Sequence, residues 1–434
     1  VMVKIRSGVL PAMRSTSLLK AIWIVAIVGA LASVVMMSKR GREWHVCAKL
    51  SGCRTRLVAK AQKSSGGLRI LEWAGKGGLL PQPVLVSTAK TGWREIWKIM
   101  MRELAPQSAD GQYIRPGYTL RSKIGTPQHP QKSGRYRLYV GNACPWCHRA
   151  LLVKAVRGIK FDSLPHTSLI DDPTKASRGG WAFGSSEETR DPLFNCRDLR
   201  QLYEKLMPGY SGRCTAPLMV DCKTQTIVSN ESEDIVRMLN DFDLLDENQT
   251  QDDTHPLIVD LYPPQLRNQI DTANEWIYKS INNGVYRCGF STSQEGYDRA
   301  IKDVTQGLDK LEEMLSKSRF LLGDKVTESD IRLLPTMARF DSVYNPFFKC
   351  TTRTIKSMPN IQGWLQDMYQ IPGVPETLDL DDAIRSYYSN LFPLNPSGIV
   401  AKGPPFNTTD PKRGSHVKQD LFYDKAERSS SSSP

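Results

Sequence analysis

The sequence lacks the features that mark secreted scaffolds and membrane proteins. Only nine of its 434 residues are cysteine, odd in number and scattered, and aromatic residues make up only 8%. The length excludes a small disulfide-stapled domain, and the cysteine pattern favours free thiols in a reducing compartment. One long uncharged apolar run occurs, and 40% hydrophobic with 24% charged residues is an ordinary composition. A polytopic membrane protein is therefore excluded.

Acidic residues are scarce only near the N-terminus. Residues 1–130 hold 5 Asp+Glu against 21 Lys+Arg, a net charge of +16. The remaining residues hold 40 acidic and 37 basic side chains, a net charge of −3. Nucleic-acid binding needs basic residues clustered on the folded surface, so this distribution argues against a nucleic-acid partner.

Residues 1–91 are predicted to be a targeting leader. Basic residues precede an uncharged apolar segment, residues 21–37, and residues 38–91 are basic, poor in acids and rich in Ser, Gly and Ala. The apolar segment is short for a membrane span and long for a signal, so a retained anchor or an artefact of gene prediction stays open. We expect a leader, cleaved or disordered, that directs import into a plastid, with a mitochondrial or cytoplasmic location as alternatives. The mature form is expected to have no membrane partner.

The pattern after residue 92 predicts a thioredoxin-like domain with an N-terminal extension over residues 92–241. Alternating residues indicate a strand at 135–140, and Pro145 at a first helical position indicates a helix over 144–157. Further elements are expected as a helix at 198–207, strands at 216–222 and 226–229, and a helix at 231–240. Their order is that of a thioredoxin-like unit.

Helical periodicity dominates the C-terminal part of the chain. After a linker over residues 242–264, residues 265–403 are predicted to form an all-helical domain. Within it, residues 327–330 spell a capping box that opens a buried helix. The polar tail at 404–434 ends in a Ser run and is predicted to be disordered. The expected fold class is α/β plus all-α.

The motif Cys144-Pro145-Trp146-Cys147-His148 carries the strongest chemical signal. A thiol just before the first helical turn faces unpaired N–H groups and the positive end of the helix dipole, which stabilise a thiolate. Cys144 is therefore the candidate nucleophile, and Cys147, one turn on, is a candidate resolving thiol. The same letters match the c-type haem attachment pattern with His148 as axial ligand, but the preceding strand and Pro145 favour a redox helix.

Two further segments are candidates for ligand binding. Pro217 opens a strand, and a cis-proline there places the preceding backbone beside the reactive cysteine in thioredoxin-like folds. Glu231 and Ser232 precede an apolar helix, where Ser232 and nearby amides can hold a carboxylate and Glu231 an ammonium. A ligand with an α-amino acid end, such as the γ-glutamyl end of glutathione, offers both groups. A strand-initiating proline and an ordinary N-cap remain the plain alternatives.

These residues resemble a known family, the glutathionyl-hydroquinone reductases, or xi class of glutathione transferases. The resemblance runs from about Trp93 to Pro405, and the leader and tail lie outside it. The matching stretches are 135–140, 143–146, 148–149, 180–183, 227–232, 276–278, 282–286, 289–290, 292–295, 330–332, 339–341, 343–344, 395–396 and 398–399. The resemblance implies a thioredoxin-like domain followed by a helical domain, and a homodimer.

The resemblance also implies roles for individual residues. Cys144 corresponds to the nucleophile, Tyr286 to a proton donor and acceptor, and Tyr344 and Tyr387 to tyrosines that help to acidify the cysteine. The family's glutathione contacts fall on Trp181, Arg213, Cys214, Thr215, Ala216, Glu231 and Ser232. Two positions depart from the pattern: Cys147 stands where bacterial members have alanine, and Ala216 replaces a larger aliphatic residue.

The implied activity is reduction of glutathionyl-hydroquinones to hydroquinones through a cysteine-glutathione mixed disulfide. Glutathione is the implied co-substrate, and no metal, flavin or nicotinamide is implied. A glutaredoxin-like or omega-type thioltransferase, or dehydroascorbate reductase, is the enzymatic alternative, since it uses the same cysteine. A non-enzymatic quinone- or tetrapyrrole-binding homologue is an alternative of another class.

Overall fold

The computed structural model describes residues 36–40, 43–47, 56–59, 82–176, 179–242, 259–404 and 421–425. They belong to two compact units, residues 1–99 and 100–434. Helix α3 (Gln82–Leu104) contains the boundary between the units. The globular part predicted to start at residue 92 therefore begins inside a helix.

The first unit contains a small antiparallel sheet. Its strands are β1 (Met36–Arg40), β2 (Glu43–Cys47) and β3 (Arg56–Ala59), hydrogen-bonded in the order β1-β2-β3. Residues 21–35 of the predicted apolar segment lie outside the described residues, and the last two residues of that segment belong to β1. Among the helices described, none is long and apolar enough to span a bilayer.

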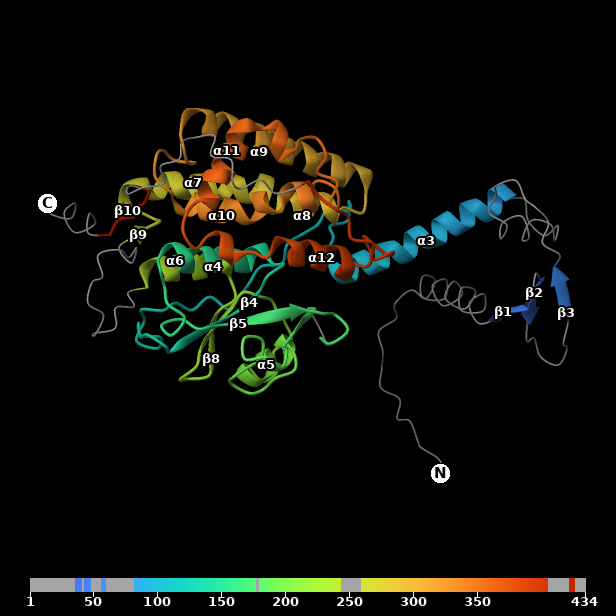
Figure 1. Ribbon diagram of the computed structural model, residues 1–434, viewed down its shortest axis with the longest axis horizontal. Coiled ribbons are helices and arrows are strands. Elements are labelled where there is room, and N and C mark those ends of the chain that lie inside the picture. Colours follow the sequence, from blue (N-terminus) through green and yellow to red (C-terminus); the bar gives the residue numbers. More distant parts are fainter. Residues whose placement is uncertain are drawn as a thin grey trace, which may run out of the picture. The chain divides into compact units, whose positions relative to one another are not determined.

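The second unit is built on a five-stranded sheet in the order β6-β5-β4-β7-β8 (Figure 1). Strand β4 is parallel to β5, whereas the other neighbours are antiparallel. The strands are β4 (Tyr136–Gly141), β5 (His166–Asp171), β6 (Trp181–Ala182), β7 (Leu218–Asp221) and β8 (Thr226–Ser229). The predicted positions of β4, β7 and β8 are correct to within two residues.

Three helices cover this sheet. They are α4 (Pro145–Val156), α5 (Leu199–Leu206) and α6 (Ser232–Asp241). Helices α4 and α6 pack together and separate the sheet from the C-terminal helices, and α5 lies on the opposite face (Figure 1). The predicted thioredoxin-like arrangement is confirmed.

The C-terminal helices form the second layer of the unit, and most of them lie above α4 and α6 in Figure 1. They are α7 (Arg267–Ile277), α8 (Gly284–Gly289), α9 (Gln294–Lys317), α10 (Glu328–Ala338), α11 (Pro359–Tyr369) and α12 (Leu380–Asn390). The predicted capping box holds the start of α10, where the Thr327 and Asp330 side chains each bond the other residue's backbone. Asp330 also accepts from the Trp364 indole at 2.9 Å, so this buried helix is fixed at its first turn.

Two predicted irregular segments contain strands. Strand β9 (Val259–Asp260) lies in the predicted linker and pairs with β10 (Tyr423–Asp424), which lies in the tail predicted to be disordered. The prediction of disorder is therefore wrong for residues 421–425, and the rest of 405–434 lies outside the described residues. Each strand has only two residues and pairs across a long sequence separation, so no local periodicity marks it.

The segment before β4, residues 105–122, is called the strap here. Near one end, the Gln107 side-chain amide donates to the Phe290 carbonyl at 2.9 Å, just after α8. At the other end, the Ser122 N–H donates to the Val228 carbonyl in β8 at 2.8 Å. The strap thus runs from the helical layer to an edge of the sheet.

Candidate active site

Cys144 is the N-cap residue of α4, with Pro145 in the first turn. Strand β4 ends at Gly141, so the sheet places the cysteine at the helix N-terminus, where the residue is partly exposed. The Sγ atom lies 3.6 Å from the carbonyl oxygen of Ala216. The peptide bond between Ala216 and Pro217 is cis, as predicted.

The two cysteines of the motif are in different environments. Burial opposes ionisation of Cys144, but the Cys147 thiol, the N–H groups of Cys147 and Trp146, and the Arg115 guanidinium outweigh it and lower its pKa to about 7. Cys147 is fully buried, and burial together with the neighbouring Cys144 raises its pKa well above the ordinary value. In the reduced protein Cys147 is therefore a hydrogen-bond donor to a Cys144 thiolate.

The Trp181 ring lies against Gly141, the last residue of β4 and three residues before Cys144. A Cβ atom at Gly141 would overlap the Trp181 ring, so only glycine permits this approach. In the same loop, a Cβ atom at Gly179 would meet the Cys214 carbonyl oxygen at 2.8 Å. Strand β6 thus packs against the end of β4, and the loop before β6 lies against the loop before β7.

The predicted run Arg213 to Ala216 forms that loop. Arg213 is exposed and Cys214 is buried, while the Thr215 carbonyl accepts from the Tyr203 hydroxyl at 2.8 Å. Tyr118 on the strap, Arg213 and the α5–β7 loop line a cavity of about 570 Å³.

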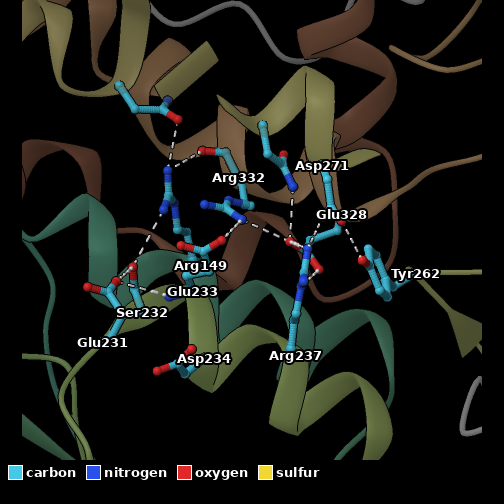
Figure 2. A network of polar contacts seen from close by, with 12 residues as sticks. Arg149, Glu231, Ser232, Glu233, Asp234, Arg237, Tyr262, Asp271, Glu328 and Arg332 are labelled. Atoms are coloured by element: carbon cyan, nitrogen blue, oxygen red, sulfur yellow. Dashed lines mark hydrogen bonds and ion pairs between the residues drawn. The ribbon is translucent and has the colours of Figure 1, made fainter. Parts of the chain in front are cut away.

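Glu231 and Ser232 lie at the N-terminus of α6, as predicted. The Glu231 carboxylate caps the helix by accepting from the Glu233 N–H at 3.2 Å. The Ser232 hydroxyl lies 3.5 Å from Nη1 of Arg149, and Nη2 of Arg149 donates to Asn282 at 2.8 Å (Figure 2). A buried cation from α4 therefore lies beside the predicted carboxylate-binding hydroxyl.

A chain of ion pairs continues from this point along the boundary between the two layers. Arg332 pairs with Glu233 and with Glu328, each at 3.0 Å, and Glu328 also pairs with Arg237 at 3.1 Å (Figure 2). Glu328 is fully buried, and its two arginine partners compensate the charge that it carries in the interior. The network fixes α6, and with it Glu231, against α10.

The three tyrosines predicted to act with Cys144 meet in one cluster. The Tyr286 hydroxyl lies 2.6 Å from that of Tyr387 and 3.4 Å from that of Tyr344. Burial and the two neighbouring tyrosines raise the pKa of Tyr286 well above its ordinary value, so it keeps its proton at neutral pH. Burial raises the pKa of Tyr344, and the Cys144 thiolate adds to this increase. The Tyr286 ring centre lies 6.2 Å from that of Trp146, two residues after Cys144, so the cluster is on the same side of α4 as the motif.

His148 is not free to bind a haem iron. Its ring is buried, with Nδ1 3.1 Å from Nη1 of Arg339 and Nε2 2.7 Å from the Thr377 hydroxyl. Arginine can only donate, so Nδ1 accepts and Nε2 carries the proton. The haem interpretation of the motif is therefore rejected on geometry.

Sequence analysis missed two residues of the site, Arg115 and Tyr118 on the strap. The Arg115 guanidinium lies 3.9 Å from the centre of the Trp146 ring, and its Nη2 donates to the Tyr118 hydroxyl at 3.1 Å. The strap has no regular periodicity, and only a basic residue next to a proline marks this position in the sequence.

Comparison with known proteins identifies the family of this chain. Residues 143–241 match the model for the glutathione S-transferase N-terminal domain, and residues 294–367 match that for the C-terminal domain. The chain is 38% identical over 324 residues to the glutathionyl-hydroquinone reductase YqjG of Escherichia coli, covering 72% of this chain and 93% of that protein. The chain belongs to the glutathionyl-hydroquinone reductase family.

Other members of this family, the xi-class glutathione transferases, agree in fold. The crystal structure of the xi transferase of Phanerochaete chrysosporium has a TM-score of 0.63 at 37% identity, covering 69% of this chain and 94% of that one. The glutathione-bound structure of YqjG has a TM-score of 0.62 at 38% identity, covering 71% and 98%.

A curated relative has a different name. The glutathione S-transferase omega-like 2 of Schizosaccharomyces pombe is 41% identical over 307 residues, covering 68% of this chain and 95% of that protein.

The matches to the two domain models, to YqjG and to the xi-class structures confirm the expected family, fold and enzyme class. The chain is a glutathione-dependent reductase.

Proposed function

We propose that this enzyme reduces glutathionyl-hydroquinones to hydroquinones and releases oxidised glutathione. Cys144 is the nucleophile and Tyr286 the proton donor, while Tyr344 and Tyr387 support both groups. Glutathione is the co-substrate, and no metal, flavin or nicotinamide takes part. Its contacts are Trp181, Arg213, Cys214, Thr215, Ala216, Glu231 and Ser232.

The reaction has two steps. The Cys144 thiolate attacks the glutathione sulfur, a sulfur–sulfur bond forms, the carbon–sulfur bond breaks, and the ring carbon takes a proton from Tyr286. The thiolate of a second glutathione then attacks the mixed disulfide, which releases oxidised glutathione and restores the Cys144 thiolate. The two glutathione sulfurs are oxidised to a disulfide, the ring carbon is reduced by two electrons, and the proton released by the second glutathione thiol replaces the one that Tyr286 gave.

The observation that carries this proposal is the tyrosine cluster, whose Tyr286 ring lies 6.2 Å from that of Trp146, two residues after Cys144. Carbon is a poor leaving atom, so its departure needs an acid that is protonated at neutral pH, and the elevated pKa keeps the proton on Tyr286. A mixed disulfide releases a sulfur anion instead and needs no such acid. The cluster therefore favours carbon–sulfur cleavage.

The second candidate is a glutaredoxin-like or omega-type thioltransferase, or dehydroascorbate reductase. It is favoured by the name of the fission-yeast relative and by Cys147, the second thiol of the motif. Under this alternative Cys147 resolves an oxidised Cys144.

Turnover of glutathionyl-menadiol compared with that of a glutathionylated peptide separates the two candidates. We expect the first substrate to be turned over with the higher kcat/KM. A protein that deglutathionylates the peptide and leaves glutathionyl-menadiol intact is a thioltransferase.

We also propose that the enzyme is a homodimer and that residues 1–91 direct it to a plastid. Analytical ultracentrifugation of the purified protein tests the first point, with a monomer as the contrary result. A fluorescent fusion to residues 1–91, expressed in cells with plastids, tests the second, with fluorescence in mitochondria or cytoplasm as the contrary result.

A further inference from the structure

Arg115 is a half-buried cation with few protein partners. Its one hydrogen bond among the described residues goes to Tyr118, and no carboxylate of that part of the chain lies within ion-pair distance. A guanidinium has five N–H donors, so most of them are available to another acceptor. A cation in this state beside a reactive thiol points to an oxygen of the substrate.

The strap and Trp146 together hold this guanidinium. Arg149 lies 4.5 Å from the centre of the same Trp146 ring, and Arg115 lies 3.9 Å from it. Both guanidinium groups therefore lie over the Trp146 ring. Stacking occupies the face of the Arg115 guanidinium and leaves its N–H donors in the plane.

This position is close to both groups of the proposed reaction. The Trp146 ring centre lies 6.2 Å from that of Tyr286, and Trp146 is two residues from Cys144. The charge of Arg115 also acts on the Cys144 thiol. Trp146 thus contacts the Arg115 cation, lies next to Tyr286, and is close in sequence to Cys144.

Carbon–sulfur cleavage needs such a cation. When Tyr286 protonates the ring carbon that bears sulfur, the adjacent hydroxyl gives its proton to water and becomes a ketone. Attack of Cys144 on sulfur then sends the carbon–sulfur electron pair through the ring onto that oxygen, which becomes a phenolate and regains a proton from water. Negative charge therefore develops on the ring oxygen as the bond breaks.

We propose that Arg115 is a catalytic residue that binds the ring oxygen adjacent to the carbon–sulfur bond and stabilises its negative charge during cleavage. This inference rests on the proposed function. The strap is then part of the active site. Its Arg115 stabilises the charge on the ring oxygen, and Tyr286 protonates the ring carbon.

Three variants test the inference: Arg115→Gln, Arg115→Lys and Lys123→Gln. Lys123 is exposed and follows the strap directly, so its variant removes the same charge away from the site. Each protein is assayed with glutathionyl-menadiol and with the mixed disulfide of glutathione and 2-mercaptoethanol. The assays are run well above the Cys144 pKa of about 7, so that the thiolate is formed in every variant.

We expect Arg115→Gln to lower kcat on glutathionyl-menadiol by about 10²-fold, the usual effect of losing one oxyanion donor. Its kcat on the mixed disulfide should change by less than about threefold, since no ring oxygen is charged there. Arg115→Lys should recover part of the loss, because lysine keeps the positive charge but lacks the paired N–H donors of the guanidinium. Lys123→Gln should match the wild type.

Three results would overturn the inference. Equal loss on both substrates would place Arg115 at the thiol, and a raised KM for glutathione with unchanged kcat would place it on a glutathione carboxylate. If Arg115→Gln behaves like Lys123→Gln, Arg115 has no role in the reaction. A wild-type enzyme that reduces the mixed disulfide and leaves glutathionyl-menadiol intact would instead refute the proposed function itself, before any variant is compared.

Discussion

Replacing Tyr286 by phenylalanine removes one hydroxyl and keeps the ring. The ring packs against Phe348 and Phe290, with centroids 5.3 and 5.8 Å away, so the variant should fold. The hydroxyl of Tyr387 loses its 2.6 Å partner but keeps Tyr344 at 3.1 Å, so no buried hydroxyl is left alone. The free energy of unfolding should fall by about 1 kcal/mol, the usual value for one hydrogen bond.

The effect on catalysis should be larger and confined to one substrate. Loss of a general acid costs about 10²-fold or more in rate, or about 2.7 kcal/mol in activation free energy. We expect this drop in kcat for Tyr286→Phe on glutathionyl-menadiol. On a small glutathione mixed disulfide the rate should change by much less, since the leaving sulfur needs no proton from a phenol.

The assay compares kcat on both substrates with thermal denaturation of the same samples. Tyr388→Phe is the matched control, because it also removes one buried tyrosine hydroxyl. The Tyr388 hydroxyl lies 3.5 Å from the Ser342 carbonyl and is not part of the tyrosine cluster. Equal loss on both substrates would mean that Tyr286 acts on the shared cysteine chemistry. Full activity on both would refute its role as proton donor.

Three further outcomes are expected. Cys144→Ser should abolish turnover of glutathionyl-menadiol, because an alcohol is not ionised near neutral pH, and retained turnover would place the nucleophile elsewhere. Cys147→Ala should raise the Cys144 pKa above about 7, by up to about one unit, since it removes a donor to the thiolate; the pH profile of iodoacetamide alkylation should then move to higher pH, and an unmoved profile contradicts the hydrogen bond. Gly141→Ala should displace Trp181 and raise the KM for glutathione about tenfold, which corresponds to about 1.4 kcal/mol of lost binding free energy. Gly92→Ala is the control and should leave the KM unchanged, because an added Cβ there meets nothing within 4 Å. Equal KM values for the two variants would mean that Trp181 does not bind glutathione.

The parts of the fold that could be predicted are those with local physical signals. The clean alternation of β4 followed by Pro145 fixes the start of α4, and with it the place of Cys144. The capping box at Thr327 fixes the start of α10 in the same way. Strand β6 has two residues and β9 pairs with a distant segment, so neither leaves a readable period in the sequence.

The site divides along the same line. Cys144 and the N-cap at Glu231 could be found from helix starts alone. Tyr286 and Tyr387 lie far apart in the sequence on different helices, so only the family resemblance marked them as one group. Arg115 was missed because its position depends on stacking with Trp146, a tertiary contact that irregular sequence does not encode locally.

The most direct test of the account is a single turnover without free glutathione. The reduced enzyme is mixed with one equivalent of glutathionyl-menadiol, and the products are analysed by mass spectrometry and chromatography. The account predicts one glutathione bound as a disulfide to Cys144, removable by dithiothreitol, and one equivalent of free menadiol. An adduct that carries the quinone ring, a glutathione on another cysteine, or release of menadiol with no adduct would contradict it.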